Sequence, residues 1–540
     1  MKAYTGKSVN GGIAVAPIKV FHKDEVHIRR IHITDPVSEI KRLEDAVNLL
    51  ENEFIELNSR SGDSIGIENA ELFNAYILIL RDAEFIGTVR ETIRNEHINA
   101  EFAVMRVGQA IANMFKSMEE EYMRSRAIDM EDVADRLTRI LLGEKAKPFA
   151  IEEPCILVAE DLSPAETVSL DKKLIKGIVT AKGSVSSHTA ILARSMDIPA
   201  MVCVPLSLRG YELRDGMMAV LDSFSTSFVV EPTESQLEDG RKKIRDIERE
   251  SEELAALADL DTVTTDGKKI RLMANIASTA ELDAVIRTGA DGIGLFRSEF
   301  LYLESRGFPS EERQFETYKT VLEKMEGKKV VIRTVDIGAD KQPEYFGTGH
   351  EENPALGFRA IRMSLKKPEI FKTQLRALLR AAVYGDLAVL YPMVTCTWEL
   401  EWIQRIVEEA AEELRERGEN FKMPMQGIMI ETPAAVVTAD ILAKKTEYFS
   451  IGTNDLVQYT LAVDRMNGMM DDFYRPKEIA IKRMIEYTVK CAHEAGILCG
   501  ICGELAADMS MTRFFIDAGI DALSVSPTFI LRLKKHIREL

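Results

Sequence analysis

The sequence has no uninterrupted apolar run long enough to span a membrane, since stretches such as Leu387–Tyr391 fall far below the roughly 18 residues required. Residues 1–10 also lack the apolar segment of a secretory signal. Basic residues are in the minority, and a net charge of −18 at pH 7 is the opposite of the basic balance of a nucleic-acid binder. We therefore expect a cytoplasmic protein that neither enters membranes nor binds nucleic acid.

Cysteine is scarce, with 6 residues in a chain of 540, so a disulfide framework is excluded as the basis of the fold. Cys499 and Cys502 form a CxxC motif, but no second pair lies nearby to complete a zinc or redox site. Their surroundings, residues 496–503, are apolar and glycine-rich, which predicts a short buried strand instead.

Proline is absent from residues 37–147, where the chain is highly charged and its apolar residues recur at helical spacing. Residues 21–144 are therefore expected to form a helical bundle, inserted after a first strand in residues 1–20. Residues 145–230 return to alternating strands and helices and, with residues 1–20, predict a small α/β domain. The highly charged segment 231–260 is typical of a solvated linker helix.

Apolar strand-like runs recur from residue 261 to 540, with helical segments between them. This alternation predicts a (β/α)8, or TIM, barrel, with a doubly wound open sheet as the competing fold. The expected strands are 270–276, 292–296, 330–335, a short one near Arg359, 387–392, 427–430, 448–451 and 498–502. The predicted fold class is thus α/β multidomain: an α/β domain carrying an inserted helical bundle, followed by a C-terminal barrel.

The ends of these runs carry an unusual concentration of arginines and carboxylates. In such barrels the carboxyl ends of the strands form the active site. Arginines pair with phosphate or carboxylate oxygens, and neighbouring carboxylates suit Mg2+, so we expect phosphoryl transfer from a phosphorylated, carboxylated small molecule. The residues are Arg297, Glu299, Arg333, Asp336, Asp340, Lys341, Arg359, Glu431, Asn454, Asp455, Cys502 and Glu504.

A second candidate site lies in the α/β domain, where a glycine and several serines lead into His188 at the start of an expected helix. Neutral imidazole is a nucleophile near neutral pH. The free N–H groups at the start of the helix would stabilise an attached phosphoryl group. Taken alone, the segment fits either this role or a capping serine before an ordinary surface histidine.

Several long strings resemble the Enzyme I family of the sugar phosphotransferase system, the phosphoenolpyruvate–protein phosphotransferases among the phosphoenolpyruvate-utilising enzymes. The resemblance extends from the first strand almost to the end of the chain, in unchanged order. The strings are the segment 181–194 around His188, IGLFRSEFLYL (293–303), ENPALGFRAIR (352–362), ETPAA (431–435), SIGTNDLVQYTLAVDR (450–465) and CGELA (502–506).

This resemblance implies a role for individual residues. His188, assisted by Thr167, would take the phosphoryl group of phosphoenolpyruvate and pass it to an HPr-like carrier protein docked on the helical bundle. Cys502 would protonate the enolate of pyruvate, which suits a thiol that is mostly protonated at neutral pH. The other implied residues are Arg297, Arg333, Arg359, Asn454 and Arg465 for the donor, and Glu431 and Asp455 for an Mg2+ cofactor. A homodimer through the barrel is also implied.

The sequence departs from the family pattern at several positions. Ser184 replaces a glycine shortly before His188, and the chain ends at Leu540, earlier than a typical member. Tyr76 stands where the carrier-docking helix often has histidine, and its hydroxyl favours a position at the rim of an interface. The docking surface is expected around Phe73, Tyr76, Ile77 and Leu80, although the apolar members taken singly favour core packing.

Two other functions fit parts of the sequence. An ATP-coupled dikinase shares the phosphohistidine domain and the barrel, but it requires a nucleotide-binding domain for which the chain has neither room nor a GxxxxGK[ST] loop. A non-catalytic paralogue that binds partners without turnover would account for the departures, but not for the complete set of donor-site residues.

Overall fold

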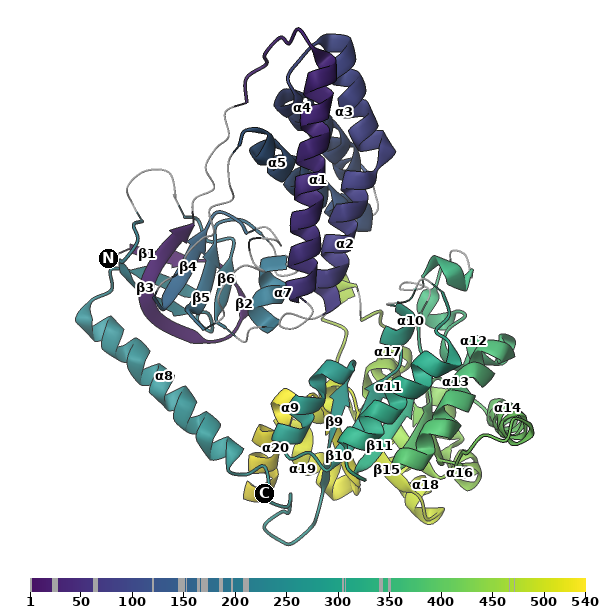
Figure 1. Cartoon of the computed structure of the whole chain (residues 1–540). Coiled ribbons are helices and arrows are strands. Elements are labelled where there is room, and N and C mark those ends of the chain that lie inside the picture. The colour runs from purple at the N-terminus through teal and green to yellow at the C-terminus, as the bar shows by residue number, and fades with distance from the viewer. Residues whose placement is uncertain are drawn as a thin grey trace. The chain divides into compact units, whose positions relative to one another are not determined.

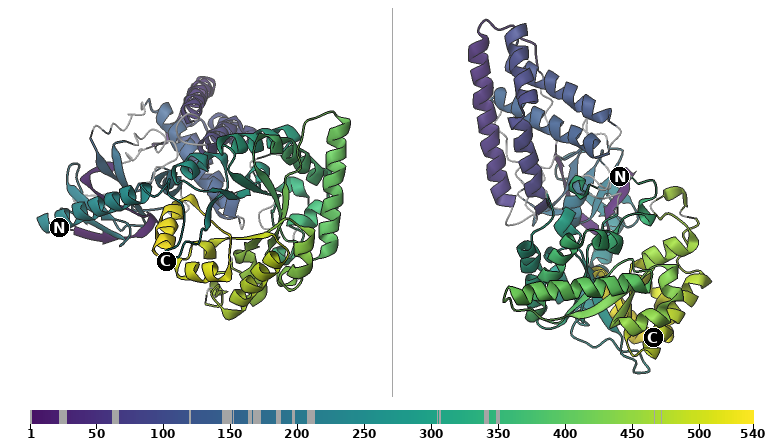
Figure 2. Two further views of the ribbon diagram at one scale, coloured as in Figure 1. Left: turned by 90° about the horizontal axis from the view of Figure 1, so that it is seen from below. Right: turned by 90° about the vertical axis from the view of Figure 1, so that its right-hand side faces the viewer.

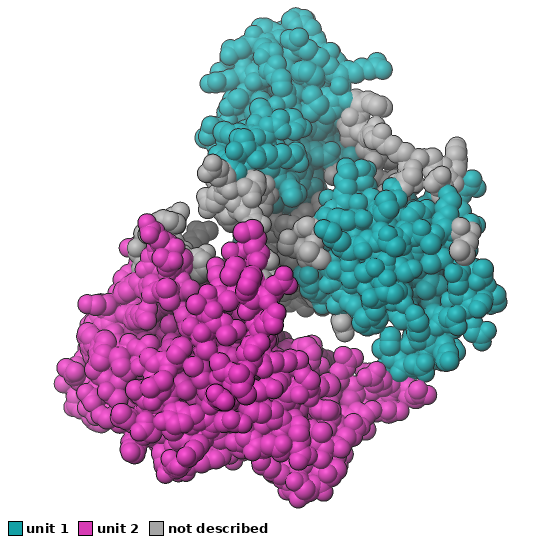
Figure 3. Space-filling model, turned by 180° about the vertical axis from the view of Figure 1, so that it is seen from behind, with its two compact units in different colours: residues 1–248 teal, residues 249–540 magenta. Residues whose placement is uncertain are grey.

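A computed structural model describes residues 2–21, 28–61, 67–118, 121–143, 151, 153–162, 166, 173–183, 188–195, 198–206, 213–303, 305, 307–338, 343–347, 351–465, 467–470 and 472–540. The chain forms two compact units, Met1–Glu248 and Arg249–Leu540, which Figure 3 distinguishes by colour. Among the described residues, no helix combines the length and the apolar character needed to cross a bilayer.

The first unit contains a mixed sheet formed by β1 (Lys2–Thr5), β2 (Lys7–Asn10), β3 (Ile13–Phe21), β4 (Cys155–Ala159), β5 (Ile175–Thr180), β6 (Ala200–Val202), β7 (Met218–Asp222) and β8 (Ser227–Val230). Its described strands follow the order β1-β8-β7-β3-β4-β5-β6-β2. Along β3 every second residue is buried, as expected of a strand in a sheet with one face covered more closely than the other. His188 is the first residue of α7 (His188–Ser195).

Residues 36–141 form the helices α1 (Pro36–Ser61), α2 (Ile67–Arg81), α3 (Ala83–Glu96), α4 (Ala100–Lys116) and α5 (Glu121–Leu141), seen in Figure 1. The predicted periodicity has a direct structural cause: Leu43, Leu50 and Phe54 of α1 are fully buried in the core that the helices share. The helix α3 begins where the Asp82 side chain accepts a hydrogen bond from the Glu84 N–H.

The predicted rim position of Tyr76 is wrong. Its side chain is fully buried, with the ring centroid 5.2 Å from that of Phe54 and 6.1 Å from that of Phe73. The hydroxyl donates a hydrogen bond to Asp132 Oδ2 at 3.1 Å. The polar partner that the hydroxyl needs therefore comes from α5 rather than from solvent. Phe73 and Leu80 are also buried, so these residues belong to the core.

The charged segment after the sheet forms α8 (Glu234–Ala255). Gly240 allows this helix to approach the sheet closely, because a Cβ at this position would lie 2.9 Å from Val15 Cγ2. Lys243 Nζ pairs with Asp222 Oδ2 at 2.7 Å on the same side of the helix. The first half of α8 is therefore fixed to β3 and β7.

The second unit contains the strands β9 (Arg271–Ile276), β10 (Gly292–Arg297), β11 (Lys329–Arg333), β12 (Leu387–Tyr391), β13 (Met425–Ile430), β14 (Tyr448–Gly452), β15 (Leu498–Cys502) and β16 (Ala522–Val525). Each strand pairs in parallel with the next, and β16 pairs with β9, so the sheet closes into a barrel. The predicted barrel is confirmed, and the open sheet is excluded. The buried strand predicted around Cys499 and Cys502 is β15.

Helices surround the barrel strands, as Figure 2 shows. They are α9 (Leu282–Arg287), α10 (Phe300–Leu303), α11 (Glu311–Lys324), α12 (Ala360–Lys366), α13 (Pro368–Ala381), α14 (Thr397–Glu416), α15 (Pro433–Val437), α16 (Ala439–Leu442), α17 (Thr453–Leu461), α18 (Ile479–Glu494), α19 (Met509–Ala518) and α20 (Pro527–Glu539). Apolar residues from strands and helices form one continuous core between the two layers.

One predicted strand is wrong. Arg359 lies in no strand but directly precedes α12, and the segment before it contains Pro354 and Gly357, which disfavour a strand. The strand that completes the barrel is β16, which has 4 residues and no long apolar run. The runs predicted as strands five to eight are therefore the fourth to seventh strands of the barrel.

Candidate active site

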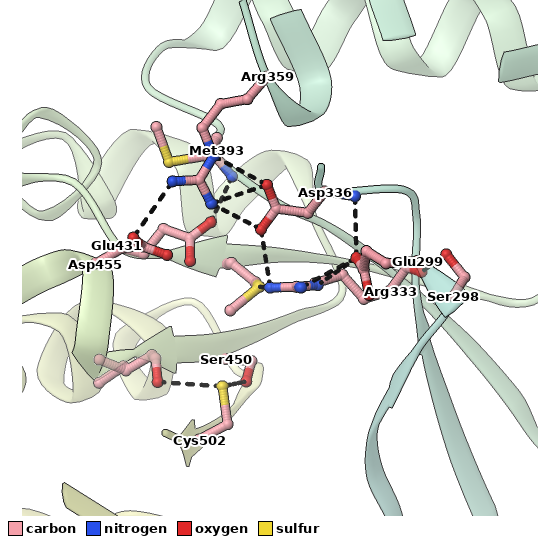
Figure 4. A network of polar contacts seen from close by, with 12 residues as sticks. Ser298, Glu299, Arg333, Asp336, Arg359, Met393, Glu431, Ser450, Asp455 and Cys502 are labelled. Atoms are coloured by element: carbon pink, nitrogen blue, oxygen red, sulfur yellow. Dashed lines mark hydrogen bonds and ion pairs between the residues drawn. The ribbon is translucent and has the colours of Figure 1, made fainter. Parts of the chain in front are cut away.

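The predicted arginines and carboxylates gather at the carboxyl ends of the barrel strands. Arg333 ends β11, Glu431 directly follows β13, Asp455 lies in the first turn of α17, and Cys502 ends β15. Arg359 reaches the same region from the residue before α12. Figure 4 shows these side chains converging on one another. The barrel thus brings together residues that are far apart in the sequence.

Asp336 is the centre of the network. Its carboxylate accepts hydrogen bonds from Arg359 Nη2 at 2.9 and 3.0 Å and from Arg359 Nε at 3.1 Å, and it pairs with Arg333 Nη1 at 3.0 Å. Burial disfavours the charged form, but the guanidiniums of Arg333 and Arg359 hold the pKa of Asp336 below its usual value. Asp336 therefore stays ionised and fixes both arginines in place.

Glu299 holds Arg333 from the other side. One of its oxygens, Oε1, accepts hydrogen bonds from Arg333 Nε at 3.2 Å, from Arg333 Nη2 at 3.0 Å and from the Asp336 N–H at 2.9 Å. Its other oxygen, Oε2, is buried without a partner among the described residues. Burial raises the pKa of Glu299 despite the nearby charge of Arg333.

Glu431 has an unused oxygen at the centre of the site. Its Oε1 accepts a hydrogen bond from the Met393 N–H at 2.6 Å, whereas Oε2 is buried and has no partner among the described residues. Burial and the negative charges of Asp455 and Asp336 raise the pKa of Glu431. A divalent cation bound by Glu431 and Asp455 would satisfy the oxygen and offset the repulsion, so the residues fit the predicted Mg2+.

Cys502 lies in the barrel interior and is almost fully buried. Its sulfur accepts a hydrogen bond from Ser450 Oγ at 3.4 Å and donates one to the carbonyl oxygen of Ile451 at 3.5 Å. Burial raises the pKa of the Cys502 thiol to about 11. The thiol is therefore protonated at neutral pH, as a proton donor must be.

The remaining donor-site residues lie closer to solvent. The side chains of Arg297 and Arg465 are exposed, and neither forms an ion pair with the residues that the structure describes. Asn454 Oδ1 accepts a hydrogen bond from the Glu504 N–H at 3.1 Å. Gly503 makes this approach possible, since its φ of +102° is strained for other residues and a Cβ would lie 3.0 Å from Asn454 Oδ1.

His188 and Thr167 belong to the other unit. The backbone of His188 begins α7, while its side chain, like the whole of Thr167, lies outside the described residues. Asp340 and Lys341 also lie outside them. Sequence reasoning placed Glu299 and Asp336 at strand ends but gave them no role, and it missed Ser450. The signal for Asp336 was its position three residues after the candidate Arg333, at the end of the same strand.

Family models match most of the chain. They are described as the PEP-binding domain of PEP-utilising enzymes at residues 251–540, the N-terminal part at residues 5–126 and the mobile domain at residues 151–225. Similarity to curated relatives extends over the whole chain. A phosphoenolpyruvate-protein phosphotransferase of Priestia megaterium is 39% identical over 541 residues, which cover 100% of this chain and 94% of the relative.

A phosphoenolpyruvate-protein phosphotransferase of Bacillus subtilis is 38% identical over 542 residues, which cover 100% of this chain and 95% of the relative. Among solved structures, an NMR solution structure of Enzyme I is 30% identical and covers 45% of this chain and 99% of its own, with a TM-score of 0.41. The matches thus extend over both units of the chain.

Proposed function

Because the chain belongs to the PEP-utilising enzymes, in the family of phosphoenolpyruvate-protein phosphotransferases, we propose that it moves the phosphoryl group of phosphoenolpyruvate to His188 and then to a histidine-containing carrier protein resembling HPr. This is the first step of a sugar phosphotransferase system. In this proposal, residues 1–20 and 145–230 carry His188, residues 21–144 dock the carrier, 231–260 link the units and 261–540 bind the donor. The enzyme acts in the cytoplasm, as a homodimer through the barrel.

The observation that carries the proposal is the arrangement of Arg333, Arg359 and Glu431. Both guanidiniums are held by carboxylates in a largely buried position, so little side-chain entropy is lost when they bind an anion. Phosphoenolpyruvate carries a phosphate and a carboxylate, and each matches the paired N–H groups of an arginine. The exposed Arg297 and Arg465 add the positive charge that this trianion requires.

Glu431 and Asp455 would hold Mg2+, which neutralises charge on the donor while the phosphoryl group is transferred. Asp336 is paired with Arg333 and Arg359, and one oxygen of Glu299 is paired with Arg333, so these two carboxylates hold the arginines in place. Asp455 Oδ1 also lies 3.4 Å from Arg359 Nη1, so in this proposal Asp455 contacts both an arginine and the metal.

The transfer balances without a further reactant. A ring nitrogen of His188 forms a bond to phosphorus, and the bond between phosphorus and the bridging oxygen breaks, leaving the enolate of pyruvate. Cys502 then gives its S–H proton to the methylene carbon of the enolate, and pyruvate leaves. The phosphohistidine lies at the start of α7, where helix N–H groups and the positive end of the helix dipole favour a phosphate.

The test is a mixture of the full chain, Mg2+ and phosphoenolpyruvate labelled in its phosphate. We expect label on His188 that is stable in base and lost in acid, and transfer of this label to an added HPr. The His188→Ala variant should carry no label but should still bind phosphoenolpyruvate and Mg2+, because the donor site lies in the barrel. Label that persists on His188→Ala would show that another residue is the acceptor.

A further inference from the structure

Two polar side chains of the barrel interior contact each other outside the arginine–carboxylate network. Ser450 lies in β14 and Cys502 at the end of β15, and both are buried. Figure 4 shows the hydroxyl and the sulfur facing each other. Cys502 also belongs to an apolar cluster of the interior that includes Leu390 and Met429.

The hydrogen bonds around the sulfur have a fixed direction. The S–H of Cys502 donates to the Ile451 carbonyl at 3.5 Å, so the sulfur lone pairs are free to accept. Ser450 Oγ is 3.4 Å from the sulfur and is therefore the donor of that bond. Among the described residues, no other side chain donates a hydrogen bond to this sulfur.

A buried thiol is a poor acid unless the thiolate that it leaves is stabilised. Burial alone disfavours the charged sulfur, while the Ser450 hydroxyl acts in the opposite direction and lowers the pKa of Cys502. The hydroxyl already points at the sulfur, so it needs no reorientation when charge develops there. The Ile451 carbonyl offers no such help, because it can only accept.

We propose that Ser450 is a positioning residue for the proton transfer by Cys502: its hydroxyl orients the thiol and stabilises the thiolate after the proton has left. In this step the S–H bond breaks, a C–H bond forms at the methylene carbon of the enolate, and the electron pair stays on sulfur. Solvent later returns a proton to the thiolate. The inference rests on the role of Cys502 in the proposed function.

The experiment follows the same proton transfer in reverse. With pyruvate, Mg2+ and the full chain in deuterated water, the small fraction of Cys502 that is thiolate removes a methyl proton, and NMR follows the exchange of that proton for deuterium. We expect Ser450→Ala to exchange about fivefold more slowly, the rate equivalent of one hydrogen bond. Ser450→Thr keeps a hydroxyl and should restore most of the rate. Single-turnover labelling of His188 by phosphoenolpyruvate should change less than twofold in both variants.

Ser524→Ala is the matched control. Ser524 is a buried serine of the adjacent strand, in register with Cys502, but its hydroxyl contacts Asn275 instead of the sulfur. In this variant pyruvate should exchange its protons at the wild-type rate. Loss of a buried hydroxyl from the barrel would then not by itself slow the exchange. Equal thermal unfolding midpoints for Ser450→Ala and Ser524→Ala would match the two variants in stability.

The outcomes separate the inference from the proposed function. Wild-type exchange in Ser450→Ala, or a fall that Ser450→Thr does not reverse, would overturn the role of Ser450 while leaving Cys502 in place. An equal loss of exchange and of His188 labelling in Ser450→Ala would also overturn it, since the barrel site would then be generally disturbed. Wild-type exchange in Cys502→Ala would instead remove Cys502 from the proposed function, and absence of label on His188 would refute the phosphotransfer itself.

Discussion

The helical bundle and the barrel each contain a largely buried network of charged and polar side chains. In the bundle, Asp132 accepts a hydrogen bond from Tyr76, while Arg136 Nη1 binds Glu53 Oε1 at 2.9 Å and its guanidinium lies over the ring of Phe54. Among the described residues, none of these side chains has a buried polar atom without a partner. The groups of this network satisfy one another.

The barrel network is incomplete by comparison. Glu299 and Glu431 each have a buried oxygen without a partner among the described residues, and the nearby Arg297 forms no ion pair with them. Burying an unpaired polar atom costs about 1–3 kcal/mol, so two such atoms on carboxylates of one network call for an explanation. The difference teaches that buried charge alone does not mark a site: the groups of the bundle network satisfy one another, whereas the barrel network keeps two unpaired oxygens, which fits the proposed binding of donor and metal.

The largest expected effect is that of Glu431→Ala. Labelling of His188 should fall about a hundredfold or more, because an oxygen proposed to hold Mg2+ is lost. The thermal unfolding midpoint should change little, because the substitution removes a buried oxygen without a partner but also removes the acceptor of the Met393 N–H, and these two effects oppose each other. The control is Glu413→Ala, which removes a carboxylate paired with Arg376 and Lys372 on the outside of the barrel and should keep normal labelling. Near-normal turnover in Glu431→Ala would erase the distinction between the two networks.

Asp132→Ala should have the opposite effects: it should lower stability and leave the labelling of His188 unchanged. It leaves the buried Tyr76 hydroxyl without its acceptor, so the local stability of the bundle should fall by about 2 kcal/mol. Hydrogen exchange at amides of α2 and α5 measures this loss, and labelling of His188 by phosphoenolpyruvate should be unchanged. A fall in labelling that matches the fall in stability would mean that the bundle network also serves the reaction.

Tyr76→Phe tests the same bond from its other end, with a smaller effect. The ring keeps its packing and only the donor to Asp132 is lost, so we expect a loss of about 1 kcal/mol by the same measurement. In the Asp132→Ala background the added loss should be close to zero, because the bond is already absent. Transfer from phosphorylated His188 to HPr should keep its rate. A changed rate would restore Tyr76 to a docking surface, despite its burial.

The smallest expected effect is on the loss of stability at acid pH. Glu311 binds Arg376, Arg380 and Arg417, and although burial opposes it, these partners lower the pKa of Glu311. Its contribution to stability is therefore complete above the unfolded pKa of about 4.3 and is lost as the pH falls through the lower folded pKa. Glu311→Gln should lower stability at pH 7 and flatten its decline between about pH 5 and 3. Parallel pH profiles of the unfolding midpoint for both proteins would contradict this assignment.

The barrel could be predicted from sequence wherever a strand was a continuous buried run, as in β12 and β14. It could not be predicted at β16, whose short run is recognisable only by its pairing with β9. The same limit applies to Arg359, which reaches the site from outside the strands. A strand pattern reports burial of local residues, whereas the closure of a barrel depends on partners far away in the chain.

The candidate site was predictable as a set of residue types but not as a network. Position at strand ends predicted where Arg333 and Glu431 lie, because the carboxyl ends of parallel strands meet. The role of Asp336 depends on its closeness to Arg359 in the folded chain, which the spacing of the two residues in the sequence does not reveal. Tyr76 was misplaced for the same reason, since its acceptor, Asp132, lies on another helix. Pairing between distant side chains is decided by the fold.

The pairing of β16 with β9 has a consequence for how the chain is made. Arg271 N–H bonds to the carbonyl of Asp521, and the side chain of Asn275 bonds to that of Ser524, across a separation of about 250 residues. Closing a loop of that length costs roughly 5 kcal/mol of chain entropy, which only the completed barrel repays. During synthesis from the N-terminus, β9 cannot pair with its last neighbour until β16 has left the ribosome. Without β16 the barrel cannot close, so the proposed donor site is complete only once β16 has paired with β9.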